Sequence, residues 1–272
     1  MSNLPAWALE PGQLEPAPAF NGLTGPIDRV WAYGDGTGAG VKVAVIDSGI
    51  DAGHPLVGGV AGAVIVEPDP DGEPGDTRLV AGPHADLYGH GTACAGIIRS
   101  LAPGVELWSV RVLGERLTGK GWVFAAGLEW CIDNGIDVVN LSLSTSNDEY
   151  YATFHELVDQ AVHTGVVLVS AMANERKATY PSEFSGVLSV AAVEDKDPER
   201  FWRNPGPPAE WGAAGIDVEA AWLGGATMEV TGNSFAAPVI AAHAARILGA
   251  HPGLAPWQVK SILAALAENA ER

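Results

Sequence analysis

Short apolar runs and longer periodic segments alternate along most of the chain. The runs are rich in Val and Ile, which is typical of strands that are buried on both faces of a parallel sheet. They predict strands at 41–47, 60–66, 106–112, 138–143, 166–171 and 187–193. Segments with apolar residues at every third or fourth position predict helices at 122–133, 150–163, 234–248 and 255–269, and a further helix that begins at His90.

This alternation of strand and helix predicts an α/β fold. We expect a single three-layer domain with a mostly parallel, doubly wound sheet and helices on both faces. The chain has 272 residues, with no internal repeat and no linker in its middle. Its first residues are rich in Pro, Ala and Gly, so we expect an N-terminal arm at 1–24 and one folded domain at 25–272.

The glycine-rich segment 34–40 resembles a phosphate-binding loop only in composition. Phosphate loops lie between a strand and the helix that follows it, whereas this segment precedes the first predicted strand. A turn that leads into that strand is the better interpretation.

The charge balance narrows the possible partners. Acidic residues outnumber basic ones by 33 to 15, which gives a formal net charge of −18. Such a field repels phosphate backbones, so we expect no nucleic acid partner, and it favours cationic substrates. No apolar run is long enough to cross a membrane, and the N-terminus lacks the basic and apolar regions of a secretory signal. We therefore predict a cytoplasmic protein without a membrane partner.

Four polar residues fall where predicted strands end or predicted helices begin. Asp47 ends the first strand, and Asn174 follows the strand at 166–171. His90 and Ser234 each begin a helix. In a parallel sheet the functional site lies at the carboxyl ends of the strands. An imidazole can activate a serine hydroxyl, a carboxylate can orient the imidazole, and an amide can stabilise an oxyanion, so these residues predict nucleophilic acyl transfer.

Three sequence blocks make this interpretation specific. Segments 47–51 (DSGID), 90–96 (HGTACAG) and 232–238 (GNSFAAP) resemble the signature blocks of the subtilisin-like serine proteases. They also occur in that family's order of Asp, His and Ser. The similarity runs from about Thr24 to the C-terminus, and the acidic composition resembles the intracellular branch of the family. The resemblance implies that 25–272 is a peptidase domain.

By this resemblance Ser234 is the nucleophile, His90 the general base and Asp47 the residue that orients it. Asn174 and the N–H of Ser234 would form the oxyanion hole. A peptide or protein substrate would bind in extended form between two backbone edges. The residues expected along it are Gly119, Ser142, Leu143, Ser144 and Ala173. These groups complete the mechanism, so no cofactor is implied.

The chain departs from the family pattern around the pocket. Ser144 and Thr145 stand where the family commonly has two glycines, and Ala173 stands where it commonly has one. The added side chains predict a narrower pocket and a restricted specificity. Asn233 replaces the usual Thr before the nucleophile; it keeps a polar group, and we expect it to be tolerated.

No metal site is expected. Many family members bind calcium in a loop after the His helix, but here the chain passes directly from 97–100 to 101–105, and Leu56 replaces an acidic ligand. The acidic loop 69–76 has oxygens that suit calcium, yet its two prolines and its spacing favour a solvated loop. Cys94 and Cys131 give neither a disulfide framework nor zinc spacing, and both are expected to be buried.

Three functions fit these residues. The first is an endopeptidase, and the second is an enzyme of the same chemistry that removes a leader peptide or transfers an acyl group. The third is a non-catalytic peptide-binding protein, which is disfavoured because no triad residue is lost. Within the arm, segment 4–7 (LPAW) could lie across the cleft and inhibit it; the alternative is a disordered or surface-packed arm.

Overall fold

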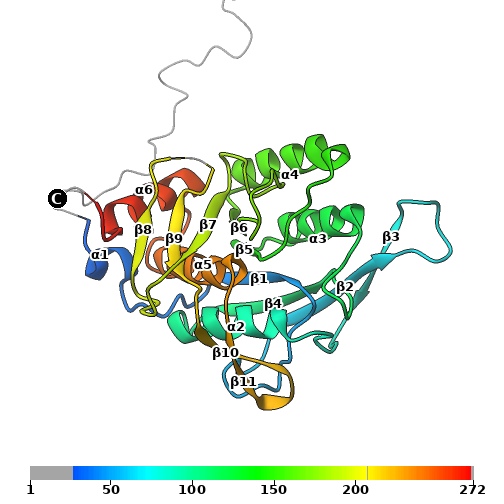
Figure 1. Cartoon of the computed structure of the whole chain (residues 1–272), viewed down its shortest axis with the longest axis horizontal. Coiled ribbons are helices and arrows are strands. Elements are labelled where there is room, and N and C mark those ends of the chain that lie inside the picture. Colours follow the sequence, from blue (N-terminus) through cyan, green and yellow to red (C-terminus); the bar gives the residue numbers. More distant parts are fainter. Residues whose placement is uncertain (1–26, 207, 271–272) are drawn as a thin grey trace, which may run out of the picture.

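The computed structural model describes residues 27–206 and 208–270 (Figure 1). The predicted arm at 1–24, including its placement across the cleft, lies outside the described residues. Among those residues no helix is both long enough and apolar enough to cross a bilayer.

A large sheet forms the middle layer, and its nine strands in the described residues have the order β3-β2-β4-β1-β5-β6-β7-β9-β8. Neighbouring strands from β2 to β9 run parallel, and β3 and β8 pair antiparallel at the two edges. The strands are β1 Lys42–Asp47, β2 Gly62–Pro68, β3 Thr77–Ala81, β4 Glu106–Arg111, β5 Val138–Leu141, β6 Val167–Ala171, β7 Leu188–Val193, β8 Phe201–Arg203 and β9 Trp211–Ala214. A separate hairpin joins β10 Val218–Ala221 to β11 Thr227–Val230.

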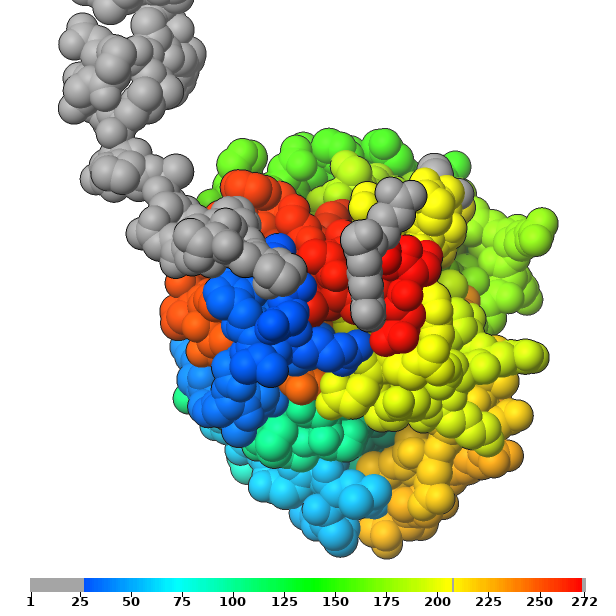
Figure 2. Space-filling model, turned by 90° about the vertical axis from the view of Figure 1, so that its left-hand side faces the viewer, coloured from blue at the N-terminus to red at the C-terminus, as the bar shows by residue number. Residues whose placement is uncertain are grey.

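Helices cover both faces of the sheet (Figure 1). One face packs against α1 Arg29–Tyr33, α2 His90–Leu101, α5 Asn233–Ala250 and α6 Pro256–Leu266. The other face packs against α3 Gly121–Asp133 and α4 Tyr151–Thr164. Short 3-10 helices lie at Asp148–Tyr150 and Leu223–Gly225. In the space-filling view, the blue segment that contains α1 lies against α5 and α6 (Figure 2).

Strand β1 shows why the central strands appear as unbroken apolar runs. Val43 and Val45 face the core under α2 and α5, whereas Ala44 and Ile46 face the core under α3. All four side chains are fully buried. The predicted three-layer α/β arrangement is therefore confirmed.

Some predicted boundaries were wrong. The strand expected at 138–143 ends at Leu141, because the next residues leave the sheet to border a cavity. The helix expected at 255–269 ends at Leu266. Segment 268–269 instead hydrogen-bonds to the edge strand β8. The acidic loop 69–76 is the turn of the β2–β3 hairpin.

Candidate active site

Strand β1 carries Asp47 to the carboxyl end of the sheet, where α2 begins with His90. The Nδ1–H of His90 donates to the carboxylate of Asp47, 2.8 Å from Oδ2 and 2.9 Å from Oδ1. Because a carboxylate only accepts, Nδ1 carries a proton, and in the neutral ring the lone pair of Nε2 is therefore free. Asp47 is fully buried and His90 is 7% exposed. Asp47 thus holds the His90 imidazole in the tautomer whose Nε2 can act as a base.

Two features fix the start of α2 against β1. A Cβ on Gly91 would overlap the carbonyl oxygen of Gly49 and lie 3.1 Å from the Cβ of Asp47, so only glycine allows this approach. The second feature is the carboxylate of Asp86, which is 6% exposed. It accepts the Ser48 hydroxyl, two loop N–H groups, and both the N–H and the hydroxyl of Thr92, at 2.6 to 2.9 Å. The N-cap residue of α2 is Gly89, which has no side chain to cap the helix, so the carboxylate of Asp86 does this instead.

The charges around His90 favour its protonated form. Burial alone would lower the pKa of His90, because it penalises the imidazolium. The charge of Asp47, its hydrogen bond and the charge of Asp86 outweigh burial, so the pKa of His90 lies above the ordinary value of 6.5. The imidazolium that forms when His90 takes a proton is therefore stabilised.

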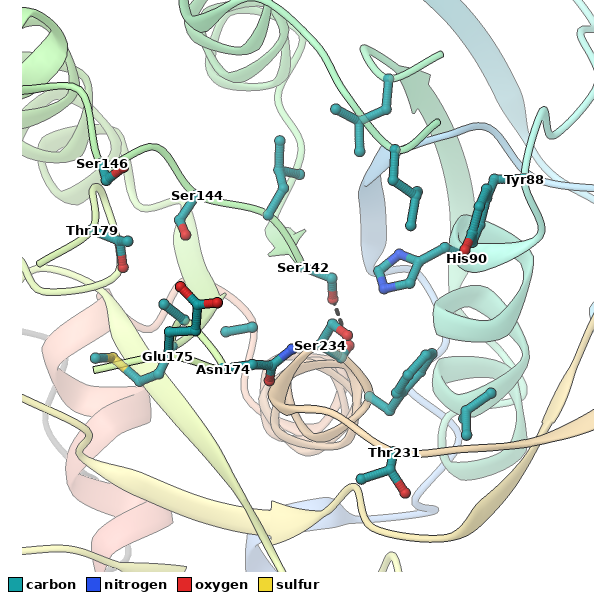
Figure 3. Close-up of a pocket in the computed structure, with 18 of the residues that line it drawn as sticks. Tyr88, His90, Ser142, Ser144, Ser146, Asn174, Glu175, Thr179, Thr231 and Ser234 are labelled. Atoms are coloured by element: carbon teal, nitrogen blue, oxygen red, sulfur yellow. Dashed lines mark hydrogen bonds between the residues drawn. The ribbon is translucent and has the colours of Figure 1, made fainter. Parts of the chain in front are cut away.

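Ser234 lies in the first turn of α5, on the cavity that His90 also borders (Figure 3). Its carbonyl oxygen accepts the hydroxyl of Ser142 at 2.7 Å. The oxygen of Ser142 in turn accepts Nδ2 of Asn140 at 3.0 Å. Since Asn140 belongs to β5 and Ser142 follows directly, the sheet holds the backbone that carries the Ser234 hydroxyl.

In the described part of the chain, Ser234 Oγ makes no hydrogen bond to His90 Nε2. The imidazole nevertheless points towards the end of α5 that carries Ser234 (Figure 3). The His90 ring packs against the ring of Phe235, the residue after Ser234, with centroids 5.2 Å apart. Catalytic hydrogen bonds are often long in unliganded enzymes and tighten when substrate binds, so this geometry is compatible with proton transfer.

Asn174 follows β6 and reaches the same space. Its Oδ1 accepts the N–H of Asn233 at 3.0 Å, which leaves Nδ2 available as a donor. A Cβ on Gly232 would lie 3.3 Å from Ser234 Oγ and 3.5 Å from Asn174 Nδ2. The hydroxyl and the amide therefore border one small space, which the glycine leaves open.

A cavity of about 710 Å³ extends from these groups. Four of the expected substrate-binding residues border it, namely Ser142, Leu143, Ser144 and Ala173. The fifth, Gly119, borders a second cavity of about 400 Å³. Leu113 borders both cavities, so the two are adjacent along the surface.

Sequence reasoning missed several residues of the main cavity. Glu175, Ser146 and Thr179 lie around one end of it, together with Ser144 (Figure 3). Glu175 directly follows Asn174, and this proximity was a usable signal. Thr179 lies in an irregular loop that no periodicity marks. Other missed residues are Tyr88, Leu113, Leu117, Trp222, Met228 and Phe235.

Cys94 packs beneath the site, as expected. Its Sγ lies 3.3 Å from the hydroxyl oxygen of Ser142 and 3.6 Å from the carbonyl oxygen of Ser234. Burial raises the pKa of this thiol well above its ordinary value, so it stays protonated at neutral pH. In residues 27–206 and 208–270 the cluster that could hold a metal is Cys94 with Asp47 and His90. A protonated thiol beside two groups that already bond to each other is a poor ligand set.

Comparisons with known proteins define the family. The Subtilase family model (Peptidase_S8) matches residues 38–272. Subtilisin DY of Bacillus licheniformis is 32% identical over 257 residues, which cover 89% of this chain and 88% of that protein. Subtilisin E of Bacillus subtilis strain 168 is 33% identical over 243 residues, which cover 84% of this chain but only 60% of that protein.

A solved structure shares the fold. It is the crystal structure of a cold adapted subtilisin-like serine proteinase, which superposes with a TM-score of 0.67 and 24% identity over 86% of each chain. The family model spans most of the chain, and the identity to the subtilisins exceeds 30%. The chain therefore belongs to the subtilase family and is a subtilisin-like serine protease.

Proposed function

We propose that this chain is an endopeptidase in which Ser234 is the nucleophile, His90 the general base and Asp47 the orienting carboxylate. The observation that carries the proposal is the buried Asp47–His90 pair, whose free nitrogen faces the end of α5 where Ser234 borders the same cavity.

The proposed reaction begins with the substrate carbonyl in the space between Ser234 Oγ and Asn174 Nδ2. Nε2 of His90 takes the hydroxyl proton while Oγ bonds to the carbonyl carbon, and the C=O electrons move to the oxygen. Asp47 stabilises the imidazolium. When the tetrahedral intermediate collapses, the peptide C–N bond breaks and His90 gives its proton to the leaving amine. Water then hydrolyses the acyl-enzyme by the same route.

The oxyanion requires donors. Asn174 Nδ2 is one, because its Oδ1 is already engaged by Asn233. The N–H of Ser234 is the second, since the first N–H groups of a helix have no acceptor within it. The dipole of the 18-residue helix α5 adds positive potential at the same end. Removing the Asn174 amide should lower kcat about 10²–10³-fold, the effect measured for the corresponding donor in a subtilisin.

The pocket supports a restricted specificity. Thr145 pairs with Tyr180 through two backbone hydrogen bonds of 2.9 and 2.8 Å, which tie the wall at 142–146 to the loop that contains Thr179. Ser144 and Thr179 make this end polar. Glu175 adds a carboxylate, which lies 3.6 Å from Nζ of Lys177. Lys177 borders the same cavity, but Glu229 adds a second carboxylate, so the lining keeps a net negative charge. We propose that the cavity prefers a polar or cationic side chain over a large apolar one.

Two measurements test the proposal. A fluorophosphonate probe should label the wild type and the Ser146→Ala control but not Ser234→Ala. Labelling that survives in Ser234→Ala would disprove the nucleophile. Peptide-library profiling should show a narrow preference for the residue before the cleaved bond. In Glu175→Gln the preference for cationic residues at that position should weaken a fewfold. Indiscriminate cleavage by the wild type would refute the restricted pocket. The cytoplasmic location stays a prediction, to be checked by cell fractionation.

A further inference from the structure

We infer that Asn233, the residue before the nucleophile, is a positioning residue that holds the oxyanion donor Asn174 in its working geometry. The inference rests on the proposed function, because it concerns how that oxyanion site is built.

The side chain of Asn233 connects two segments that are distant in sequence. Its Nδ2 donates to the carbonyl oxygens of Met172 and Ala173, at 3.2 and 3.1 Å. Its Oδ1 accepts the N–H of Ala192 in β7, at 2.9 Å. Carbonyl oxygens only accept and an N–H only donates, so the amide can take just this orientation. Asn233 thus fastens the two residues that precede Asn174 to α5 and to the sheet.

The backbone of Asn233 orients the side chain of Asn174. The Asn233 N–H donates to Oδ1 of Asn174 at 3.0 Å, which forces Nδ2 to the opposite side of the amide. That side is the space beside Gly232 where Nδ2 and the Ser234 hydroxyl converge. One residue therefore fixes both the backbone before the donor and the direction of its N–H bonds.

Apart from the bonds of Asn233, the main restraint on the residues just before Asn174 is the Met172 N–H, which donates to the carbonyl oxygen of Val190 at 2.9 Å. Residues 174–178 are all exposed, so packing gives this stretch weak restraint. A threonine, which the family commonly has at position 233, offers one hydroxyl and therefore cannot donate two hydrogen bonds while accepting a third. The amide of Asn233 is thus more than a tolerated replacement, because the geometry makes it a three-bond clamp on the oxyanion loop.

A double-mutant cycle tests this role. Asn174→Ala should lower kcat about 10²–10³-fold with little change in KM. Asn233→Ala should lower kcat about 10- to 100-fold with KM nearly unchanged, because displacement of a catalytic group by an ångström has effects of that size. If Asn233 acts through Asn174, the double variant should be no slower than Asn174→Ala alone.

Two results would overturn the inference: independent effects that multiply in the double variant, or an Asn233→Ala defect confined to KM. Asn233→Asp is a nearly isosteric control that keeps the acceptor but loses both donors, and it should be as slow as Asn233→Ala. Asn233→Thr should retain intermediate activity, and it replaces the alanine variant in the cycle if that variant does not fold. Asn147→Ala, on the exposed loop before α4, should match the wild type. Failure of the probe to label wild-type Ser234 would instead refute the proposed function itself.

Discussion

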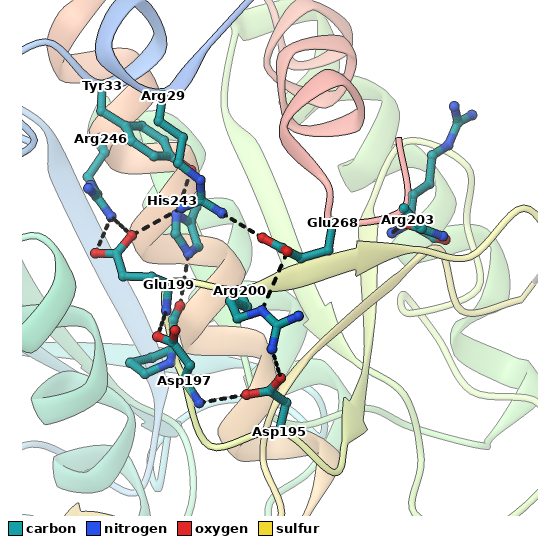
Figure 4. Close-up of polar contacts among 12 residues, drawn as sticks. Arg29, Tyr33, Asp195, Asp197, Glu199, Arg200, Arg203, His243, Arg246 and Glu268 are labelled. Carbon is teal, nitrogen blue, oxygen red and sulfur yellow. Dashed lines mark hydrogen bonds and ion pairs between the residues drawn. The ribbon is translucent and has the colours of Figure 1, made fainter. Parts of the chain in front are cut away.

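Acid should destabilise this protein through His243, which is fully buried on α5. Its Nδ1 lies 2.7 Å from the Tyr33 hydroxyl, and its Nε2 lies 3.0 Å from the carbonyl oxygen of Pro198 (Figure 4). A carbonyl only accepts, so Nε2 carries the proton, and Nδ1 accepts from Tyr33. The neutral ring therefore satisfies both neighbours, whereas a second proton would place a charge in the core beside Arg29 and Arg246.

The size of the effect follows from the pKa difference between the folded and unfolded chain. Burial lowers the pKa of His243 from 6.5 to about 3. The charges of Arg246 and Arg29 act in the same direction, whereas the Pro198 hydrogen bond and the charge of Asp197 oppose it. Between these pKa values the unfolded chain binds a proton that the folded chain does not. The free energy of unfolding therefore decreases as the pH is lowered. The loss is about 1.4 kcal/mol per pH unit, or roughly 2 kcal/mol by pH 5.

Urea unfolding followed by tryptophan fluorescence measures this loss. A Ser234→Ala background lacks the proposed nucleophile and should therefore not digest its own unfolded copies. His243→Gln removes the titration but keeps a donor and an acceptor, and groups common to both proteins cancel in the difference. The stability advantage of the background over His243→Gln should shrink by roughly 2 kcal/mol from pH 8 to pH 5. His163→Gln, at an exposed position of α4, is the matched control for the loss of an imidazole.

Parallel stability curves for the background and His243→Gln would refute the reasoning. They would mean that the folded protein takes up the proton at His243 as readily as the unfolded chain, and the polar groups around the ring in Figure 4 would then have to accommodate the charge. A large change in the His163→Gln control would also contradict it, because the pH dependence would not be specific to the buried ring.

Three further predictions concern the site. Ser142→Ala removes the 2.7 Å hydrogen bond to the Ser234 carbonyl and should lower kcat about fivefold with KM nearly constant, equivalent to about 1 kcal/mol; an unchanged kcat would contradict it. Asp86→Asn replaces an acceptor oxygen with a donor and should lower the free energy of urea unfolding by roughly 2 kcal/mol. It should also move the acid limb of kcat/KM to lower pH, because the charge of Asp86 helps to raise the pKa of His90, and an unmoved limb would exclude this coupling. Gly232→Ala places a methyl group 3.3 Å from Ser234 Oγ and should reduce kcat/KM at least about 100-fold without changing urea unfolding; near-normal kinetics would show that substrate does not enter this space.

The buried part of the fold could be predicted because its signal is local. Strands such as β1 and β6 are covered on both faces, so nearly every residue is apolar and the run identifies itself. The helices α3 and α4 show apolar spacing over three or more turns, and the 18-residue helix α5, which is buried almost all round, is too long an apolar segment for a strand. Fold class therefore followed from patterns that extend over only a few residues.

The edges of the sheet could not be predicted, because their strands are short and partly exposed. β3 exposes Leu79 and Val80, and β8 at the other edge has only three residues. β9 beside it is buried but reads WGAA, with one large apolar residue in four. In the β10–β11 hairpin, Glu219 lies directly opposite Glu229, a like-charge pair that no pairing rule favours. β3, β8 and β9 form because the rest of the large sheet offers them hydrogen-bonding partners, and β10 and β11 form because they pair with each other. A local pattern contains neither kind of partner.

In the candidate site, too, some features could be predicted from the sequence and others could not. Its residue types and their order along the chain were visible in three sequence blocks. The contacts that support them were not, since Asp86 lies in a loop that has no secondary-structure pattern. Asn233 was interpreted only as a tolerated substitution, because its partners at 172–173 and 192 become neighbours only after folding. Sequence supplied the groups that we propose to react, whereas the folded chain determines which groups hold them.

The two halves of the site are held by different helices. Asp47 and His90 are fixed to each other by the junction of β1 and α2, which Gly91 closes. Ser234 is held near Asn174, the proposed oxyanion donor, by the N-terminus of α5, where the hydroxyl and the amide of Asn233 lie on adjacent residues. A small shift of α5 would therefore preserve the geometry between Ser234 and Asn174, the proposed nucleophile and oxyanion donor, and would change the distance from Ser234 to His90. Within the described residues Ser234 Oγ and His90 Nε2 are not hydrogen-bonded, and α5 packs directly against α2, so the packing of these two helices is where the proposed contact would be adjusted.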